Sequence, residues 1–327
     1  MDRPVKLALI GCGAIATREH LPGFRSAGPD QVEIVAFASR TRASAERARA
    51  LWGAGSVVDS WEEVVSRADV DAVDIATPPD LHREIAVRAM RAGKHVLVEK
   101  PMALGVDEAR EMEAAARECG VVLETAEWPR YNGAMRAGAG AIRSGAIGTL
   151  TGVEGFLAHG GPQEWAPHAR WFFEKHHAGG GVLMDLGVHA IDGVRAVSGQ
   201  EAEAVAAVIS GVVNGVEHEA DVLFQLASGV PGHLRVSWRA PYENVANVVA
   251  WGTEGQLVVT ASSAVIRRRA GVVEKLVPDP SSNLYADFIR ACREAGSVRP
   301  SGVDGRAAMA FVTASYRASA GCAWVTV

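Results

Sequence analysis

The chain has 327 residues, of which 48% are hydrophobic and 22% are charged, ordinary proportions for a globular protein with a buried core. At roughly 150 residues per domain, this length suggests two domains. The formal net charge of -5 provides no positive field for nucleic acid or an anionic membrane. No stretch approaches the ~20 apolar residues of a membrane span, and no signal-peptide pattern opens the chain. We therefore expect a cytoplasmic protein with no nucleic-acid or membrane partner.

The first part of the chain alternates short apolar runs with helical patterns, which is typical of βαβ units and a parallel sheet. Strands are expected at residues 5–10, 32–38, near 57, 70–76, 95–98 and 121–125. Helices are expected at residues 14–27, 43–52, 81–92 and 106–118. Pro22 should bend the first helix or end it early, and Ser60 with Glu63 forms a capping-box pattern. The sequence thus predicts a parallel α/β domain over residues 1–125.

The pattern changes after this point. Apolar runs separated by Gly, Asn and Ser, with few helices between them, predict a mainly antiparallel sheet. Strands are expected at residues 152–157, 204–213, 220–226, 233–238, 245–251 and 256–260. Helices are expected at residues 131–144, 182–197, 285–294 and 305–320. We expect residues 126–327 to form a second, α+β domain.

A dinucleotide-binding fingerprint of the form G-x-G-x-x-A follows the first strand. It consists of Gly11, Cys12, Gly13, Ala14, Ile15 and Ala16. Gly11 permits the tight turn, Gly13 lets the backbone approach a pyrophosphate, and Ala16 allows the helix to pack closely on the strand. The helix N-terminus adds N–H donors for the phosphates. Such a turn can occur by chance, but its position within βα units predicts a Rossmann domain that binds a dinucleotide.

The end of the second strand bears on cofactor choice. It reads Ser39-Arg40-Thr41-Arg42, with no carboxylate before Glu46 to accept hydrogen bonds from the ribose of NAD. A hydroxyl and two guanidiniums suit a 2′-phosphate, so NADP is preferred over NAD. In the alternative, Arg40 stacks on adenine and Arg42 is simply solvated.

Two places carry candidate catalytic groups. Lys100 ends the apolar run of a predicted strand, where open parallel sheets bind ligands, and Pro101 stiffens that end. Asp185 and His189 are four residues apart in a predicted helix, so they share one face, and a carboxylate can set the tautomer of an imidazole. Most isolated pairs of this kind are surface or core pairs. The glycines at 179–181 favour function, because they allow close approach of a ligand or another segment.

We expect no bound metal. The histidines at 159, 168, 176, 177 and 189 lie close in sequence, but their spacing matches no zinc-site pattern. The cysteines at 12, 119, 292 and 322 form no C-x-x-C pair.

Together, GCGAIA at 11–16, EKP at 99–101 and GGGVLMDLGVH at 179–189 resemble the Gfo/Idh/MocA oxidoreductases, the glucose-fructose oxidoreductase and inositol dehydrogenase family. TPPDLH at 77–82 and SGAIG at 144–148 extend the resemblance over essentially the whole chain. The resemblance implies a Rossmann domain followed by an α+β domain with a large open, mainly antiparallel sheet. It also implies a homodimer or homotetramer.

The resemblance further assigns residues to roles. It implies that Lys100, Asp185 and His189 are catalytic and that the bond before Pro101 is cis. It places Thr77, Pro78 and His82 along the cofactor and Glu99 beside the nicotinamide ribose. Two stretches depart from the family pattern: Phe172 follows Trp171 where many members have Arg, and residues 127–132 match only loosely.

The expected function is hydride transfer between NAD(P) and a hydroxyl or ketone carbon of a sugar, cyclitol or similar polyhydroxylated substrate. His189 would exchange the hydroxyl proton, Lys100 would stabilise the developing alkoxide, and Asp185 would orient the pair. Two alternatives stay open. One is redox-assisted glycoside cleavage with a recycled NAD, and the other is a non-catalytic, dinucleotide-binding regulator.

Overall fold

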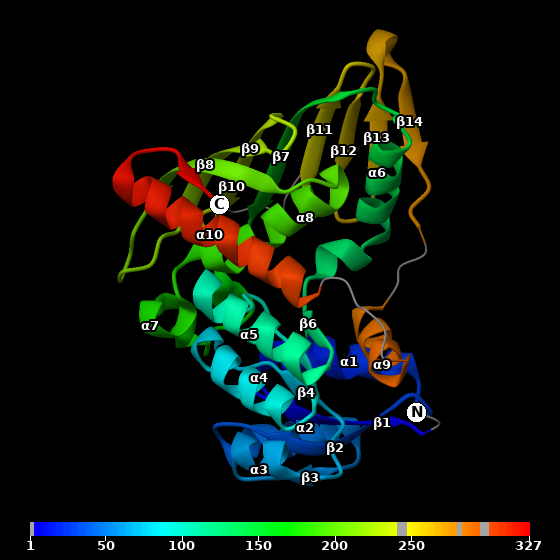
Figure 1. Cartoon of the computed structure of the whole chain (residues 1–327), viewed down its shortest axis with the longest axis vertical. Helices are drawn as coiled ribbons and strands as arrows, with labels where there is room; N and C mark the ends of the chain where they lie inside the picture. Colours follow the sequence, from blue (N-terminus) through cyan, green and yellow to red (C-terminus); the bar gives the residue numbers. More distant parts are fainter. Residues whose placement is uncertain (1–2, 241–246, 280–282, 295–300) are drawn as a thin grey trace. The chain divides into compact units, whose positions relative to one another are not determined.

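The computed structural model describes residues 3–240, 247–279, 283–294 and 301–327 (Figure 1). The chain forms two compact units. The first unit is Met1–Ala126 with Asn283–Arg306, and the second is Glu127–Ser282 with Ala307–Val327. Residues 283–294 and 301–306, which the sequence pattern groups with the second domain, therefore belong to the first unit. Within the described residues, no helix combines the length and apolar character that crossing a bilayer needs.

The first unit is built on a six-stranded sheet in the order β3-β2-β1-β4-β5-β6, with all pairs parallel. The strands are β1 (Val5–Ile10), β2 (Val32–Ala38), β3 (Ser56–Val57), β4 (Ala72–Ile75), β5 (His95–Val98) and β6 (Leu123–Thr125). The central strands are buried on both faces, as parallel strands covered by helices require. The strand order reverses between β1 and β4, so the predicted Rossmann topology is confirmed.

The helices of this unit connect successive strands, except α9, which comes from the later segment of the unit. They are η1 (Ala16–His20), α1 (Leu21–Ala27), α2 (Arg42–Trp52), α3 (Trp61–Ser66), η2 (Pro79–Leu81), α4 (His82–Arg91), α5 (Val106–Cys119) and α9 (Leu284–Glu294). Pro22 does not end the first helix early. It lies in the first turn of α1, directly after the π-helical turn η1, where a missing N–H is tolerated. The predicted cap is present, since Ser60 Oγ accepts a hydrogen bond from Glu63 N at 3.3 Å.

The second unit holds a nine-stranded sheet in the order β14-β13-β12-β11-β7-β10-β9-β8-β15. Its strands are β7 (Leu150–Ala158), β8 (Ala202–Ser210), β9 (Glu219–Leu226), β10 (Pro231–Ser237), β11 (Val248–Gly252), β12 (Gln256–Val259), β13 (Ala264–Arg267), β14 (Val273–Leu276) and β15 (Val325–Thr326). Among these strands, β7 and β10 pair in parallel and the other neighbours are antiparallel. The mainly antiparallel prediction is confirmed. Residues 245 and 246 of one expected strand lie outside the described residues.

The second unit also contains helices. They are η3 (Trp128–Tyr131), α6 (Gly133–Arg143), η4 (Pro162–Glu164), η5 (Arg170–Phe173), α7 (Lys175–Ala178), η6 (Leu183–Gly187), α8 (Val188–Ser198), η7 (Arg269–Gly271) and α10 (Gly302–Gly321). Helices α6 and α8 pack on each other; α6 contacts β12 and β13, and α8 contacts β7 and β11 (Figure 1). Phe311 of α10 meets Phe224 of β9 edge to face, with ring centroids 5.7 Å apart. The core of the second unit lies between these helices and the sheet.

Candidate active site

The glycine-rich turn after β1 combines a crowded position with an open one. Gly11 has φ +95°, and a Cβ there would overlap the carbonyl oxygen of Ala76 at the end of β4. Its N–H donates to Ala38 O at 2.9 Å, which ties β1 to β2. A Cβ on Gly13, in contrast, would meet no heavy atom within 4 Å. The turn thus leaves room at the glycine where a pyrophosphate is expected to approach.

The predicted cofactor residues lie after four adjacent strands of the first unit. They are residues 11–16 after β1, 39–42 after β2, 77–82 after β4 and 99–100 after β5. Because the carboxyl ends of parallel strands share one edge of the sheet, the fold brings these segments together.

The hydroxyl of Thr77 gives a direct test of whether this edge fits a ligand. Thr77 Oγ1 is buried and has no hydrogen-bond partner among the described residues. An unpaired buried hydroxyl costs free energy, and a polar ligand atom would satisfy it. Nearby, the buried ring of His82 spans two carbonyls, with Nε2 2.8 Å from Thr77 O and Nδ1 3.0 Å from Pro101 O. The residues present therefore fit a bound dinucleotide.

The candidate phosphate-binding groups after β2 differ in their surroundings. Cys12 N donates to Ser39 Oγ at 3.4 Å, which links the glycine turn to this segment. Arg40 is exposed. Arg42 is exposed too, but its guanidinium lies 3.1 Å from Glu46 and 2.8 Å from Asp59. One of the two guanidiniums is thus already paired.

The Cys12 side chain is buried, and its role is to fill space in the core. Burial, reinforced by the charge of Asp74, raises the pKa of Cys12 to about 12. The protonated thiol is neither a nucleophile nor a metal ligand at neutral pH.

Lys100 is half-buried directly after β5. Its peptide bond to Pro101 is cis, as the family resemblance implies. Glu99 Oε2 accepts a hydrogen bond from Lys100 N at 2.9 Å, so the two predicted residues are linked through the backbone. The other oxygen of Glu99 contacts His20, a residue to which the sequence pattern assigns no role.

The three glycines at 179–181 admit another segment of the chain. A Cβ on Gly181 would overlap the backbone of Glu217, and one on Gly180 would overlap the hydroxyl of Tyr316. The buried Glu217 carboxylate accepts hydrogen bonds from Gly181 N at 2.9 Å, Leu183 N at 3.0 Å and Tyr316 OH at 2.7 Å. Glu217 thereby caps the start of the helical segment that carries Asp185 and His189.

The carboxylate at His189 Nδ1 is Glu127, a short contact between two buried side chains. Asp185 instead accepts a hydrogen bond from Trp238 Nε1 at 2.9 Å and lies 3.7 Å from His159 Nε2. The expectation that Asp185 sets the His189 tautomer is corrected by these contacts. Asp185 lies in the π-helical turn η6, whereas His189 lies in α8, and the carboxylate at Nδ1 comes from outside this helical segment.

Glu127 has a sequence signal that the helical spacing did not reveal. It is an acidic residue two positions beyond β6, with the buried Ala126 before it and the exposed Trp128 after it. Its partner, however, is 62 positions away. Arg130 secures the arrangement, because its guanidinium contacts the buried Asp192 carboxylate through Nε at 2.9 Å and Nη2 at 2.7 Å. This pair joins η3 to α8 beside the Glu127 contact.

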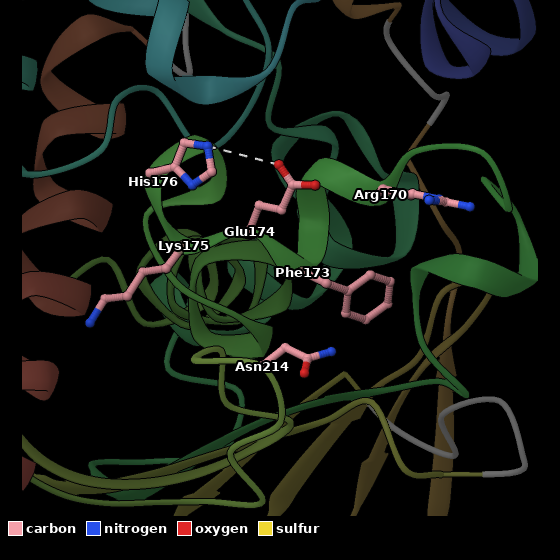
Figure 2. Close-up of a pocket in the computed structure, with 6 residues that line it drawn as sticks. All are labelled: Arg170, Phe173, Glu174, Lys175, His176 and Asn214. Atoms are coloured by element: carbon pink, nitrogen blue, oxygen red, sulfur yellow. Dashed lines mark ion pairs between the residues drawn. The ribbon is translucent and has the colours of Figure 1, made fainter.

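An open hollow of about 920 Å³ lies in the second unit. It is lined by Arg170, Phe173, Glu174, Lys175, His176 and Asn214 (Figure 2). Arg170 is the arginine next to Trp171, where the sequence departs from the family pattern. The lining carries both signs of charge, which suits a polar ligand better than an apolar one.

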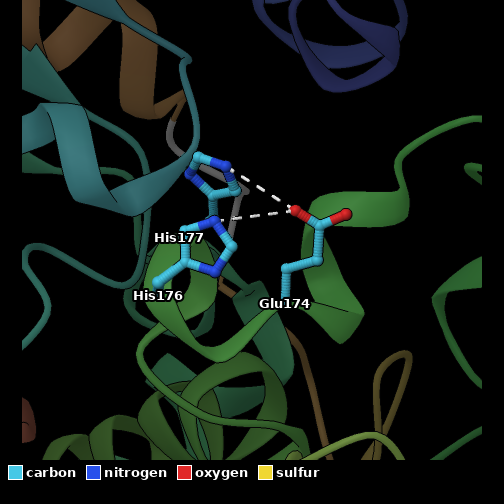
Figure 3. A group of neighbouring side chains, drawn as sticks. All are labelled: Glu174, His176 and His177. Carbon is cyan, nitrogen blue, oxygen red and sulfur yellow. Dashed lines mark ion pairs between the residues drawn. The ribbon is translucent and has the colours of Figure 1, made fainter.

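Three side chains beside this hollow could bind a metal (Figure 3). Glu174 Oε2 lies 3.8 Å from His176 Nε2 and 3.6 Å from His177 Nε2. Metal-binding histidines are normally held by a second hydrogen bond, whereas His176 is 73% exposed. The absence of a bound metal stays a prediction.

Known proteins resemble the chain over nearly its full length. Residues 5–127 match the family model described as "Oxidoreductase family, NAD-binding Rossmann fold", and residues 135–258 match the "GFO/IDH/MocA C-terminal domain". The chain is 37% identical to a 1,5-anhydro-D-fructose reductase from Ensifer adhaerens, over 95% of both chains.

Solved structures show the same architecture. A levoglucosan dehydrogenase in complex with NADH and levoglucosan is 25% identical, with a TM-score of 0.90 over 99% of this chain and 100% of that one. A 3-ketoreductase from Actinomadura kijaniata, in complex with NADP and TDP-benzene, is 27% identical, with a TM-score of 0.85 over 97% and 98%. The two matched domains and the full-length relative show that the chain belongs to the Gfo/Idh/MocA family of oxidoreductases.

Proposed function

We propose that this oxidoreductase transfers a hydride between a nicotinamide dinucleotide and a hydroxyl or ketone carbon of a sugar. The observation that carries the proposal is the 37% identity, over 95% of both chains, to a 1,5-anhydro-D-fructose reductase. The levoglucosan dehydrogenase complex supports the same substrate class. These two sugars are therefore the first compounds to test, followed by other aldoses, ketoses and cyclitols.

The bound nicotinamide supplies the hydride acceptor or donor, and the chain supplies proton and charge control. Lys100 donates a hydrogen bond to the substrate oxygen and stabilises the negative charge that develops on it. His189 takes the proton of that oxygen during oxidation and returns it during reduction. Glu127 accepts from His189 Nδ1, which leaves Nε2 for the substrate. Asp185 stays a proposed catalytic residue, and its carboxylate contacts Trp238 and His159.

We propose NADP as the preferred dinucleotide, with NAD as the alternative. Ser39 and Arg40 offer a hydroxyl and a guanidinium after β2, and no carboxylate precedes Glu46. Fluorescence titration of the apoprotein with NADPH and NADH measures this preference. Tighter binding of NADH would contradict it.

A homodimer or homotetramer is also proposed, in the cytoplasm. Val208 and Leu223 are 69% and 54% exposed, and they lie diagonally on the same face of the paired strands β8 and β9. Two large exposed apolar side chains on one sheet face suit a subunit contact. Light scattering across a concentration series checks the oligomeric state.

The decisive experiment is a substrate screen with both dinucleotides, followed by absorbance of the reduced cofactor. Lys100→Ala and His189→Ala should each lower kcat by about 10²-fold or more, while dinucleotide affinity is largely kept. Lys275→Ala, on exposed β14, serves as the matched control. Wild-type turnover in both active-site variants would contradict the mechanism. Glycoside cleavage without net cofactor turnover would favour the alternative function, redox-assisted glycoside cleavage with a recycled NAD.

A further inference from the structure

Two buried carboxylates lie on one face of the sheet in the first unit. Asp74 is on β4 and pairs in register with Leu97 of β5. Glu99 is two positions beyond Leu97, so it is displaced toward the same face as Asp74. The Asp74 side chain is fully buried, and that of Glu99 is 12% exposed. Two buried carboxylates so placed would repel each other and would each pay a desolvation penalty.

His20, at the end of η1, lies between them. Its Nδ1 is 2.8 Å from Asp74 Oδ2, and its Nε2 is 2.8 Å from Glu99 Oε1. The imidazole is fully buried and is covered by Tyr285 of α9, with ring centroids 5.2 Å apart. These contacts connect the helix after the glycine-rich turn to the ends of two central strands.

Hydrogen-bond chemistry indicates the charge of this ring. An ionised carboxylate only accepts, so two carboxylate partners require N–H on both ring nitrogens. Burial by itself lowers the pKa of His20. The charge of Asp74 and the hydrogen bonds to Asp74 and Glu99 outweigh burial, and they raise the pKa of His20 to about 10. The two acceptor contacts indicate an imidazolium between two carboxylates, although burial also raises the pKa of Asp74.

The bridge continues to the proposed catalytic lysine. Glu99 uses Oε1 for His20 and Oε2 for the backbone N–H of Lys100, at 2.9 Å. Rotation of the Glu99 carboxylate would break both contacts together. The orientation of Glu99, and the backbone from which the Lys100 side chain extends, therefore depend on His20.

We propose that His20, held by Asp74, is a positioning residue that fixes the Glu99 carboxylate and, through it, the backbone of Lys100. This inference rests on the proposed function, because it assigns importance to Lys100. His20 itself touches no reacting atom in this proposal.

Two substitutions separate positioning from simple packing. His20→Gln places an amide nitrogen near the former Nε2 and can still donate to Glu99. His20→Asn places an amide nitrogen near the former Nδ1, so this variant can donate a hydrogen bond to Asp74 but not to Glu99. Both remove the ring and its charge, so a packing role predicts similar effects from both.

The expected kinetic result is a difference in kcat. We expect His20→Asn to lower kcat roughly 10- to 100-fold, as loss of alignment in an active site does, with KM for the sugar nearly unchanged. His20→Gln should retain at least several-fold more kcat than His20→Asn. His95→Gln, at a half-buried histidine of β5, is the control for histidine loss and should leave kcat unchanged. Equal kcat in the two His20 variants, at equal denaturation midpoints, would overturn the proposal.

A second measurement needs neither substrate nor cofactor. In protein labelled with ¹⁵N-histidine, one ring should show two protonated nitrogens at pH 8, and this signal should vanish in both His20 variants. A His20 ring without a proton on Nε2 would overturn the proposal even if kcat falls, because it could not donate to Glu99. If the wild type shows this signal but turns over no sugar, the proposed function fails, and the His20 bridge is left as a structural feature only.

Discussion

His189 Nδ1 contacts the carboxylate of Glu127, and both side chains are buried. A carboxylate at Nδ1 fixes which ring nitrogen carries the proton and so determines what Nε2 presents to a substrate. The two residues are 62 positions apart and come from the end of the β6 segment and from α8. His189, the proposed proton-transfer residue, is therefore oriented by a residue outside its own helix.

Removing the charge of Glu127 should impair catalysis more than binding. Glu127→Gln can present either an oxygen or an NH₂ to Nδ1, so the tautomer is no longer fixed. We expect kcat to fall at least about tenfold. This loss is part of the roughly 10²- to 10⁴-fold rate enhancement that general acid–base catalysis contributes. Steady-state kinetics with the screened sugar measure this, with Glu118→Gln as an exposed control. An unchanged kcat would show that another group orients His189.

The two glycines of the dinucleotide loop should respond differently to alanine. Gly11→Ala puts a Cβ against Ala76 O at φ +95°, so the free energy of unfolding should fall by more than about 1 kcal/mol. Gly13→Ala meets open space, so stability should stay within about 0.5 kcal/mol. Dinucleotide affinity of Gly13→Ala should nevertheless fall about tenfold or more, since the Cβ occupies the approach of the pyrophosphate. Urea denaturation and fluorescence titration separate the two effects.

The pairing of Arg42 offers a test of cofactor preference. The Arg42 and Asp59 side chains are 61% and 86% exposed, and exposed ion pairs contribute about 0.2–1 kcal/mol. Asp59→Asn combined with Glu46→Gln should free the guanidinium and raise NADPH affinity up to about fivefold, with NADH affinity unchanged. Arg40→Ala should weaken the binding of NADPH and leave the binding of NADH unchanged. Equal changes in the affinities for NADPH and NADH would show that these arginines do not recognise the 2′-phosphate.

The His20 bridge predicts a pH dependence of stability. The folded-state pKa of about 10 lies above the unfolded value of 6.5. The stabilisation is therefore complete below pH 6.5 and is lost as pH rises through 10. Between these limits the free energy of unfolding should fall by up to about 1.4 kcal/mol per pH unit. Urea denaturation at pH 7, 8 and 9 should show this decline in wild type and a flatter profile in His20→Gln. Parallel profiles would mean that His20 is neutral when folded.

Glu217 should stabilise the helix that carries His189. Glu217→Gln keeps the size but replaces an acceptor by an amide at a site with three donors. The free energy of unfolding should fall by about 1–3 kcal/mol. Tyr316→Phe removes one of these bonds and should cost about 0.5–1.5 kcal/mol. Glu203→Gln, at an exposed position of β8, is the control. A comparable loss of unfolding free energy in that variant would argue against a specific cap.

Local sequence determined much of this protein. The apolar run 5–10, the glycines after it and the run 95–98 ending at Lys100 predict parallel strands and a dinucleotide loop, because period and turn chemistry are short-range properties. The same is true of the Ser60 cap. The resemblance of residues 11–16, 99–101 and 179–189 identified the family.

Tertiary structure alone decided which side chains meet. No spacing pairs Glu127 with His189, or His20 with Asp74 and Glu99, because these contacts depend on strand register and on helices that pack from distant segments. The expected pairing of Asp185 with His189 rested on helical spacing alone, but the carboxylate at His189 Nδ1 is that of Glu127, from outside the helix. Secondary structure follows from neighbours in sequence, whereas the protonation and orientation of buried groups follow from neighbours in space.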